Sequence, residues 1–320
     1  MDTLQIMLKN VIIFVLLAVP GFLMVKGKLL TGKDSGTLSK LLTYVGMPFM
    51  IMGSTMNLSF TGSFTKAMLI TAGIGVVFIL TMYGVTGLIV RSSDKKRRGM
   101  MRFCMIFANN GFIGIPLAKA VFPEGSEVIA YLIVLNILNN VLMFTLGAYL
   151  ISGDKKTMNV KKAVLNPVLL GFLAGIALNL LGVGKLIPEV EKYSNYFSGI
   201  VTPLSMLVLG IKLAEVPLKK LLFSGRMYYV SLVRLILFPA LCVVIMLALQ
   251  FVPGLGVNDD MVMGFFIAFV MPTAGLASAF SDQYKGDTEG AVVFTLGTTV
   301  LSVAVIPALY WVVDLVLKTL

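Results

Sequence analysis

Ten long runs of apolar residues, separated by short polar segments, account for most of the chain. They lie at 4–25, 38–56, 67–90, 102–122, 128–151, 165–183, 198–214, 228–252, 261–283 and 289–317. Because a helix needs about 20 apolar residues to cross the hydrocarbon core of a bilayer, each run predicts a transmembrane helix. The expected fold class is an all-α integral membrane protein with ten transmembrane helices and no room for a sizeable soluble domain.

Composition and charge add an orientation to this picture. Apolar residues make up 58% of the 320 residues and charged residues only 13%, which is far below the content of a soluble domain. Of the 26 basic residues, 19 lie in the linkers that follow odd-numbered runs, at 26–40, 91–102, 155–162, 212–226 and 285. The positive-inside rule places these linkers in the cytoplasm, so both termini of a multi-pass cell-membrane protein are expected outside. The net charge of +11 therefore reports topology, and no nucleic-acid partner is expected.

Two pairs of prolines suggest that the chain is a repeat. Pro48 and Pro203 lie 155 residues apart, and Pro116 and Pro272 lie 156 residues apart. A repeat of five helices reverses its direction between copies because five is odd, as in many secondary transporters. We therefore expect two inverted five-helix repeats, at 1–151 and 165–320, joined by a cytoplasmic linker at 152–164.

The fourth and ninth runs contain residues that interrupt helices. The fourth carries two amides, two glycines and a proline, and the ninth carries a proline, a threonine and a glycine. Proline removes a helical hydrogen bond and glycine accepts irregular backbone, so we expect the fourth helix to break between Asn109 and Pro116. Broken backbone inside a bilayer requires protein or water to satisfy it, so the two breaks are expected to face each other around one site. The alternative is a kinked, well-packed helix pair without a ligand.

A half-helix that begins at such a break presents free N–H groups and the positive end of a dipole, which favours a carboxylate. Amide oxygens and freed carbonyls would equally suit sodium. In the fifth run, Asn136 and Asn140 share a helix face and would either line the cavity or hold neighbouring helices together. The candidate substrate-binding residues are Asn109, Asn110, Gly111, Gly114, Pro116, Asn136, Asn140, Pro272, Thr273 and Gly275.

Few ionisable residues lie near the membrane core. Arg234 is expected to be structural, pairing with Asp282 or with a lipid headgroup, while Lys119 and Lys212 are expected to reach an interface. The chain has no histidine, so a proton relay lacks its commonest part. Asp282 and Asp287, at the cytoplasmic rim, are the candidate coupling residues, and sodium coupling, proton coupling, uniport and anion exchange all remain open.

Three segments resemble a known family. Residues 109–117 (NNGFIGIPL), together with 271–274 (MPTA) and 284–287 (YKGD), resemble the auxin efflux carrier family in its compact bacterial, malate or malonate permease-like form. The resemblance implies a scaffold part, a transport part and broken fourth and ninth helices that cross beside the substrate. It also implies that Pro116 and Pro272 are the crossing prolines.

These observations predict a secondary transporter of a small organic anion, either a mono- or dicarboxylate or an auxin-like acid, that works by alternating access. The alternative is an ion-coupled, channel-like or sensor membrane protein without carboxylate transport. An enzyme is not expected, because ordinary serine–histidine and zinc–histidine chemistry needs the missing histidine. No cofactor or metal site is predicted. The expected partners are a carboxylate, the lipid bilayer and sodium or protons, and a homodimer is left open.

Overall fold

The regular secondary structure of the first half of the described chain is helical throughout. The computed structural model describes residues 3–56, 58, 61–123, 125–215 and 223–319. Up to residue 164 its helices are α1 (Thr3–Lys26), α2 (Asp34–Leu41), the π-helical turn η1 (Leu42–Gly46), α3 (Met47–Met56), α4 (Gly62–Ile89), α5 (Lys95–Ile106), the π-helical turn η2 (Asn110–Gly114), α6 (Ile115–Val121), α7 (Glu127–Leu142), the π-helical turn η3 (Met143–Gly147), α8 (Ala148–Ser152), the short 3₁₀ turn η4 (Lys155–Thr157) and α9 (Val160–Val164).

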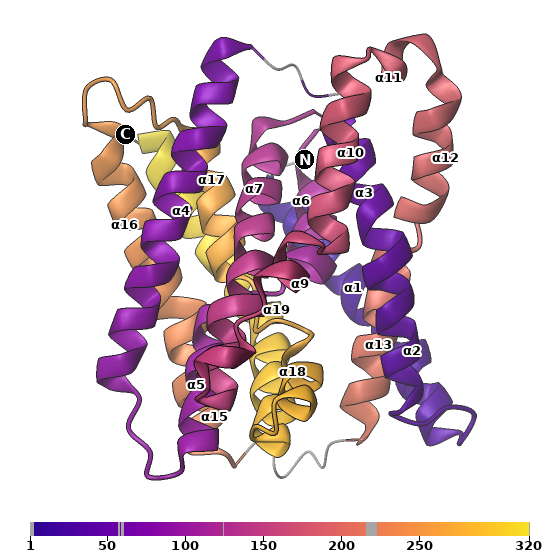
Figure 1. Cartoon of the computed structure of the whole chain (residues 1–320), viewed down its shortest axis with the longest axis vertical. Coiled ribbons are helices and arrows are strands. Elements are labelled where there is room, and N and C mark those ends of the chain that lie inside the picture. Colours follow the sequence, from indigo (N-terminus) through magenta and orange to yellow (C-terminus); the bar gives the residue numbers. More distant parts are fainter. Residues whose placement is uncertain (1–2, 57, 59–60, 124, 216–222, 320) are drawn as a thin grey trace.

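The second half is built in the same way. Its helices are α10 (Pro167–Leu180), α11 (Val183–Leu186), α12 (Pro188–Ser198), α13 (Val201–Glu215), α15 (Gly225–Leu232), the π-helical turn η5 (Val233–Leu237), α16 (Phe238–Gln250), α17 (Asp259–Val270), α18 (Ala277–Gln283) and α19 (Thr288–Thr319). The helices stand side by side along the longest axis of the molecule (Figure 1). The all-helical class predicted from the sequence is thereby confirmed for the described residues.

Seven helical segments among the described residues are long and apolar enough to cross a membrane. They correspond to the first, third, fifth, sixth, seventh, eighth and tenth predicted spans. The second span is the continuous helix of α2, η1 and α3. The fourth and ninth spans are each divided, into α5 and α6 and into α17 and α18, so neither half reaches the length of a single crossing.

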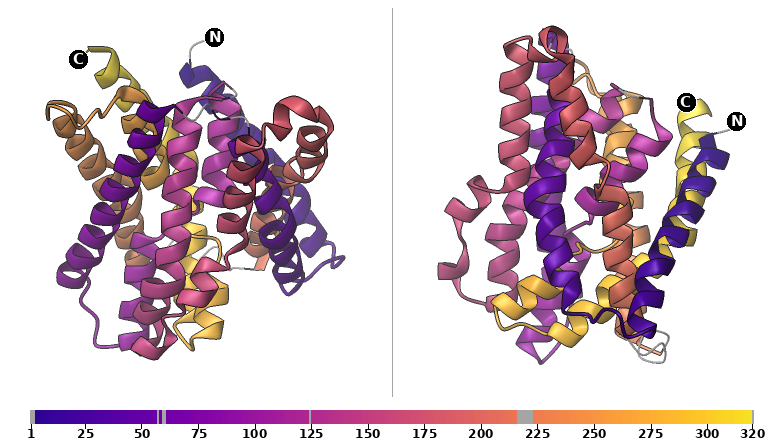
Figure 2. Two further views of the ribbon diagram at one scale, coloured as in Figure 1. Left: turned by 45° about the horizontal axis from the view of Figure 1, so that its top comes forward. Right: turned by 90° about the vertical axis from the view of Figure 1, so that its right-hand side faces the viewer.

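The closest helix pairs connect the two predicted halves. α1 packs along α13, and α3 packs along α10 (Figure 2). Glycines allow this approach, since a Cβ on Gly21 of α1 would overlap the backbone of Leu207, and one on Gly171 of α10 would overlap that of Pro48. Small residues at such contacts are how membrane helices pack closely. The first helix of each half therefore lies on the second helix of the other.

The sequence distance between equivalent helices corrects one part of the repeat predicted from the prolines. α3 and α13 begin 154 residues apart, which agrees with the spacing of Pro48 and Pro203. The interrupted helices α5 and α17, however, begin 164 residues apart. Pro116 and Pro272, 156 residues apart, therefore do not occupy equivalent places in the two interrupted helices. The predicted division at 1–151, 152–164 and 165–320 stays a prediction.

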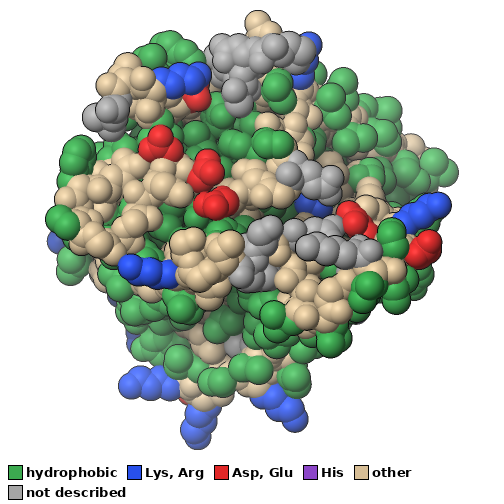
Figure 3. Space-filling model, turned by 90° about the horizontal axis from the view of Figure 1, so that it is seen from above, with side chains coloured by type: hydrophobic (Ala, Val, Ile, Leu, Met, Phe, Trp, Pro, Cys, Tyr) green, Lys and Arg blue, Asp and Glu red, His purple; other side chains and the backbone are tan. Residues whose placement is uncertain are grey.

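The two ends of the molecule differ in charge. The two chain termini lie at the same end, the upper end in Figure 1, while α2, α18 and the start of α5 lie at the other. Figure 3 looks onto the end with the termini, where acidic side chains gather near the middle and apolar side chains make up much of the rim. This arrangement suits a protein that is surrounded by lipid.

Candidate functional site

The two interrupted helices meet in a short antiparallel bridge between Ala108 and Thr273. The Asn109 N–H donates to the Pro272 carbonyl at 2.8 Å, and the Ala274 N–H donates to the Phe107 carbonyl at 2.9 Å. Each break thus supplies the hydrogen-bond partners that the other lost when its helix ended. This pairing explains how non-helical backbone is tolerated inside the bundle.

The first break begins earlier than expected. α5 ends at Ile106, and helix resumes at Asn110 with the π-helical turn η2, so the non-helical residues are Phe107–Asn109 and not the predicted segment from Asn109 to Pro116. Pro116 lies in the first turn of α6, inside the helix that begins at Asn110, and the Phe112 carbonyl four residues earlier accepts from the Ser205 hydroxyl instead. Pro272 does lie in the bridge. The expectation of two crossing prolines therefore holds for Pro272 and is wrong for Pro116.

Side chains hold the bridge from both sides. Asn139 of α7 forms two hydrogen bonds with Ala108, accepting from its N–H and donating to its carbonyl, both at 3.1 Å. On the other side, the Thr273 N–H donates to Thr298 Oγ1 at 3.2 Å, and the Thr273 hydroxyl donates to the Cys104 carbonyl at 2.8 Å. Thr273 is fully buried, so its hydroxyl serves the bridge.

Arg234 lies completely buried behind the bridge. Its guanidinium donates to the Met271 carbonyl at 2.8 Å, to those of Met105 and Ile106 at 3.2 and 3.0 Å, and to that of Ala268 at 3.4 Å. These carbonyls belong to the C-terminal ends of α5 and α17. The expected pairing with Asp282 or a lipid headgroup is wrong, because a helix end is where carbonyls lack partners and a guanidinium satisfies several at once.

Free N–H groups lie on the opposite side of the bridge. The N–H groups of Asn110, Gly111 and Phe112 stand at the start of a helix, where N–H groups have no intrahelical acceptor, and those of Gly275 and Leu276 form no backbone hydrogen bond outside helices among the described residues. The first three begin the helix that runs through η2 and α6. They supply the positive end of a helix dipole, as the sequence predicted.

A cavity of about 490 Å³ opens beside these groups. Its polar side chains are six asparagines, one glutamine, two lysines, a threonine and a tyrosine, and none of the described residues that line it is acidic. The lining side chains that carry amides or positive charge are Asn109, Asn136, Asn139, Asn140, Asn159, Asn166, Gln283, Lys161 and Lys162. The cavity opens towards the end of the molecule that carries the basic linkers.

The cavity gathers about half of the predicted site. The predicted residues that line it are Asn109, Gly111, Asn136, Asn140 and Gly275. Asn110 is buried beside it, and its Oδ1 has no partner among the described residues. Gly114, Pro116, Pro272 and Thr273 do not line the cavity and lie in η2, in α6 or at the bridge itself. They shape the site without facing the cavity.

Asn136 is the amide of this cavity with an unused donor. Its side chain is 1% exposed, and its Oδ1 accepts from Asn140 Nδ2 at 3.1 Å. Its Nδ2 has no partner within the described part of the chain. A buried donor without a partner costs free energy, which an acceptor on a bound ligand would recover.

Sequence reasoning missed eight of the eleven polar lining residues, four of which come from the linker or the start of α10. Asn159, Lys161 and Lys162 come from the linker, and Asn166 caps α10 through Val168. Nothing in their local sequence places them beside the fifth helix, since that depends on how the linker folds back. Asn139 was visible in the pattern, because it lies three residues from Asn136 and so on the same helix face.

A second, smaller cavity of about 270 Å³ lies towards the opposite end, where Gly53, Ser54, Lys119 and Asn195 are among its lining residues. On α3, the first cavity reaches Met47 and the second begins at Gly53. Six residues of helix span about 9 Å. Within this interval Met50 and Ile51 are buried, at 2% and 0% exposure, and neither lines either cavity.

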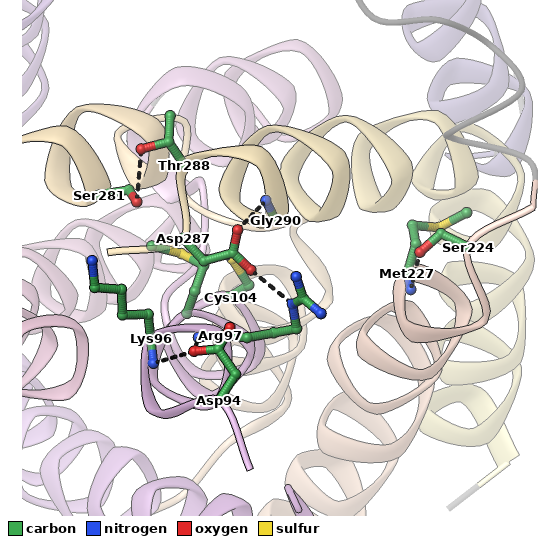
Figure 4. Close-up of polar contacts among 11 residues, drawn as sticks. Asp94, Lys96, Arg97, Cys104, Ser224, Met227, Ser281, Asp287, Thr288 and Gly290 are labelled. Atoms are coloured by element: carbon green, nitrogen blue, oxygen red, sulfur yellow. Dashed lines mark hydrogen bonds and ion pairs between the residues drawn. The ribbon is translucent and has the colours of Figure 1, made fainter. Parts of the chain in front are cut away.

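The candidate coupling residues lie away from the cavity. Asp287 forms an ion pair with Arg97 at 3.2 Å and accepts from the Gly290 N–H at 2.9 Å (Figure 4). Asp282 accepts from the Thr288 hydroxyl at 2.8 Å. These contacts tie α5, α18 and α19 together at the basic end, and a role in coupling stays a prediction.

The two lysines differ in their surroundings. Lys119 lines the second cavity. Lys212, on α13, donates from Nζ to the Gly275 carbonyl at 3.1 Å, so it points into the second break and the expectation that it reaches an interface is wrong. The carbonyl at a break lacks a helical partner, and a lysine satisfies it.

Comparison with known proteins agrees with this geometry. A family model described as "Membrane transport protein" matches residues 6–310. A protein from Rhizobium meliloti (strain 1021) that is named as a candidate malonate transporter is 24% identical over 292 residues, which cover 88% of each chain. A transporter of uncharacterised function from Methanothermobacter thermautotrophicus (strain ATCC 29096) is 26% identical over 307 residues, covering 93% of this chain and 94% of that protein.

Proposed function

The chain belongs to the membrane transport protein family, the auxin efflux carrier family that its sequence resembles, and we propose that it is a secondary transporter of small organic anions. One observation carries the proposal. The larger cavity combines amide donors, two lysines and free backbone N–H groups, and none of its described lining residues is acidic. Such a lining attracts a carboxylate and disfavours a cation.

The cargo we propose is a small mono- or dicarboxylate. Asn109 and Asn136 would donate to its carboxylate together with the N–H groups of Gly111 and Gly275. A cavity of about 490 Å³ lies within the usual range for small-molecule sites. Similarity to a candidate malonate transporter makes malonate the first compound to try.

The mechanism we propose is alternating access by ten transmembrane helices in two inverted five-helix repeats. Support comes from the exchange of first helices between the halves, in the pairs α1 with α13 and α3 with α10. Further support comes from the two cavities, which reach different levels along α3 and share no lining residue. In this scheme the two pairs form the scaffold, and the bridge with its surrounding helices moves.

Two contacts join the proposed scaffold to the bridge region in this conformation. Ser205 of α13 donates to the Phe112 carbonyl at 3.0 Å, and Lys212 of α13 donates to the Gly275 carbonyl at 3.1 Å. Both would have to break if the bridge region moved along α13. The proposed location is the cell membrane, with both termini outside and the larger cavity open to the cytoplasm.

The test is uptake by purified protein in liposomes. Labelled malonate and a panel of small carboxylates would be offered with and without a sodium gradient and a pH gradient. Saturable uptake, accelerated by unlabelled acid on the opposite side, is expected of a carrier, because counterflow requires a single alternating site. Uptake proportional to concentration, without counterflow, would instead favour the channel-like alternative.

Two substitutions locate the site. Asn109→Ala removes a lining donor and Pro272→Ala alters the bridge, and both are expected to depress uptake at least fivefold. Asn10→Ala in α1 and Pro253→Ala in an exposed loop are matched controls outside the cavity. Melting temperature and elution volume would establish that each variant is folded. Normal uptake by both site variants would refute the assignment.

A further inference from the structure

We propose that Arg234 sets the charge selectivity of the larger cavity without touching the cargo. By cancelling the negative ends of α5 and α17, it leaves the positively polarised groups of the bridge to face the cavity. Arg234 does not line the cavity, so its effect would pass through the bridge. It would therefore be a positioning and selectivity residue and not part of the binding surface.

The geometry of the two half-helices poses an electrostatic problem. Both α5 and α17 run towards the bridge, so both bring their C-terminal ends to it. A helix end of this kind carries about half a negative charge, and two of them amount to roughly one. Without compensation they would repel an anion bound on the other side of the bridge.

Arg234 is placed to cancel this charge. Its Nε and Nη2 donate to Met271 and Ala268 at the end of α17, and its Nη1 donates to Met105 and Ile106 at the end of α5. An arginine side chain stays charged in proteins. No acidic side chain pairs with Arg234 within the described part of the chain, so the helix ends are its counter-charge.

The π-helical turn η5 contains Arg234 and lies against α17 and α5. The first half has π-helical turns as well, but its α4 is regular over 28 residues and carries no arginine at the corresponding depth. Among the described residues, the positive charge that compensates the ends of α5 and α17 thus comes from the second half. One charge serves both half-helices because the bridge brings their ends together.

The central experiment measures the potential in the cavity with charged thiol reagents, and it needs no knowledge of the cargo. Leu276 lines the cavity at the second break, so Leu276→Cys provides a reporter thiol. The native Cys104 and Cys242 are 0% and 1% exposed, and the unmodified protein measures their background. Anionic sulfonatoethyl and cationic trimethylammonium-ethyl methanethiosulfonate would be compared, each normalised to its rate with a free thiol.

The expected result is a faster reaction with the anionic reagent. In the Arg234→Gln background the anionic-to-cationic rate ratio should fall roughly tenfold, which is the size expected for one charge at close range in a partly shielded site. Arg234→Lys should keep most of the ratio because it keeps the charge. Arg102→Gln is the matched control, because Arg102 also donates to a backbone carbonyl, that of Tyr83, but does not line the cavity and donates to none of the carbonyls that Arg234 binds.

An unchanged ratio in Arg234→Gln protein that elutes and melts normally would overturn the proposal. If that variant does not fold, a double variant of the two lysines that line the cavity provides the test. Replacing Lys161 and Lys162 with glutamine should change the ratio at the Leu276→Cys reporter by less than about threefold if Arg234 is the main source. Loss of the whole preference in this double variant would assign the selectivity to the lysines and refute the proposal.

A second test measures transport in liposomes, and this test rests on the proposed function. In liposomes, Arg234→Gln should raise KM for malonate and weaken its preference over neutral malonamide by about tenfold, while Arg234→Lys restores both. Absence of carboxylate uptake by the unmodified protein would refute the proposed function but would leave the labelling result standing. Uptake by the unmodified protein, with equal KM and preference in Arg234→Gln, would refute the inference alone.

Discussion

The two breaks form one bridge, but they bring different chemistry to it. The first break places Asn109 in the cavity and is held by two hydrogen bonds from Asn139. The second break contributes backbone groups to the cavity, and its only hydroxyl, on Thr273, is used to hold α5. In exchange, the second half supplies the buried charge of Arg234.

This difference shows which features a structural repeat has to keep. Both halves keep an interrupted helix, because each break satisfies the free backbone groups of the other. Side chains are not bound by that requirement. In our proposal the first half supplies the amides that bind the cargo and the second half supplies the compensating charge, so we expect unequal effects of substitutions at the two breaks.

The largest effect is expected at Asn139. Asn139→Ala removes two hydrogen bonds and leaves the N–H and carbonyl of Ala108 unpaired in a buried site, which costs about 1–3 kcal/mol for each group. We expect a lower melting temperature and a loss of uptake of more than tenfold. Asn179→Ala is a suitable comparison, because the Asn179 side chain also forms two hydrogen bonds with the backbone, donating to the Met56 and Leu58 carbonyls, but does not line the cavity. Equal uptake by these two variants would contradict the importance of the bridge.

The second-largest effect is expected at Asn136, where a substitution should change cargo binding and not protein stability. Asn136→Asp keeps the shape of the side chain but adds a negative charge to a cavity whose described lining has none. We expect KM for an anionic cargo to rise at least tenfold, with a smaller rise in Asn136→Ala. Steady-state uptake at several concentrations separates KM from maximal rate. A change in maximal rate alone would indicate that Asn136 holds helices together.

A smaller effect is expected from added methyl groups at two glycines. A Cβ on Gly275 would lie 3.3 Å from both Asn109 Nδ2 and Phe112 Cδ2, so it would displace a binding amide. A Cβ on Gly111 would lie 2.6 Å from the methyl end of Met47, which is flexible and turns away at low cost. We expect Gly275→Ala to raise KM about threefold to fivefold and Gly111→Ala to change it less than twofold. The reverse order would contradict the proposed role of Asn109 in binding.

The sequence predicted the existence of the breaks better than their exact position. Proline, glycine and asparagine mark where a helix is unlikely to continue, and both segments were recognised in this way. The bridge itself depends on which carbonyls face each other across the bundle, so the break at Phe107–Asn109 fell earlier than the residues that signal it. A local pattern reports what a helix tolerates and does not report its partner.

Long-range contacts account for the remaining differences. Arg234 and Lys212 were expected to find an acidic partner or an interface, yet both donate to carbonyls freed by the breaks. Those carbonyls become visible only once the path of the interrupted helices is known. The family resemblance predicted crossing helices correctly, but it transferred a proline, Pro116, whose position here is the first turn of α6.

The smallest effect on uptake is expected at Thr298, the side chain that supports the second break. Thr298→Val removes the acceptor of the Thr273 N–H, and one lost hydrogen bond in a buried site costs about 1–3 kcal/mol. The two backbone hydrogen bonds of the bridge remain, and Asn139 still fixes Ala108. We therefore expect a lower melting temperature but uptake within about twofold of the unmodified protein. If Thr298→Val abolished uptake as Asn139→Ala is expected to do, the two breaks would share the positioning of the site equally, and the division of labour between them would be wrong.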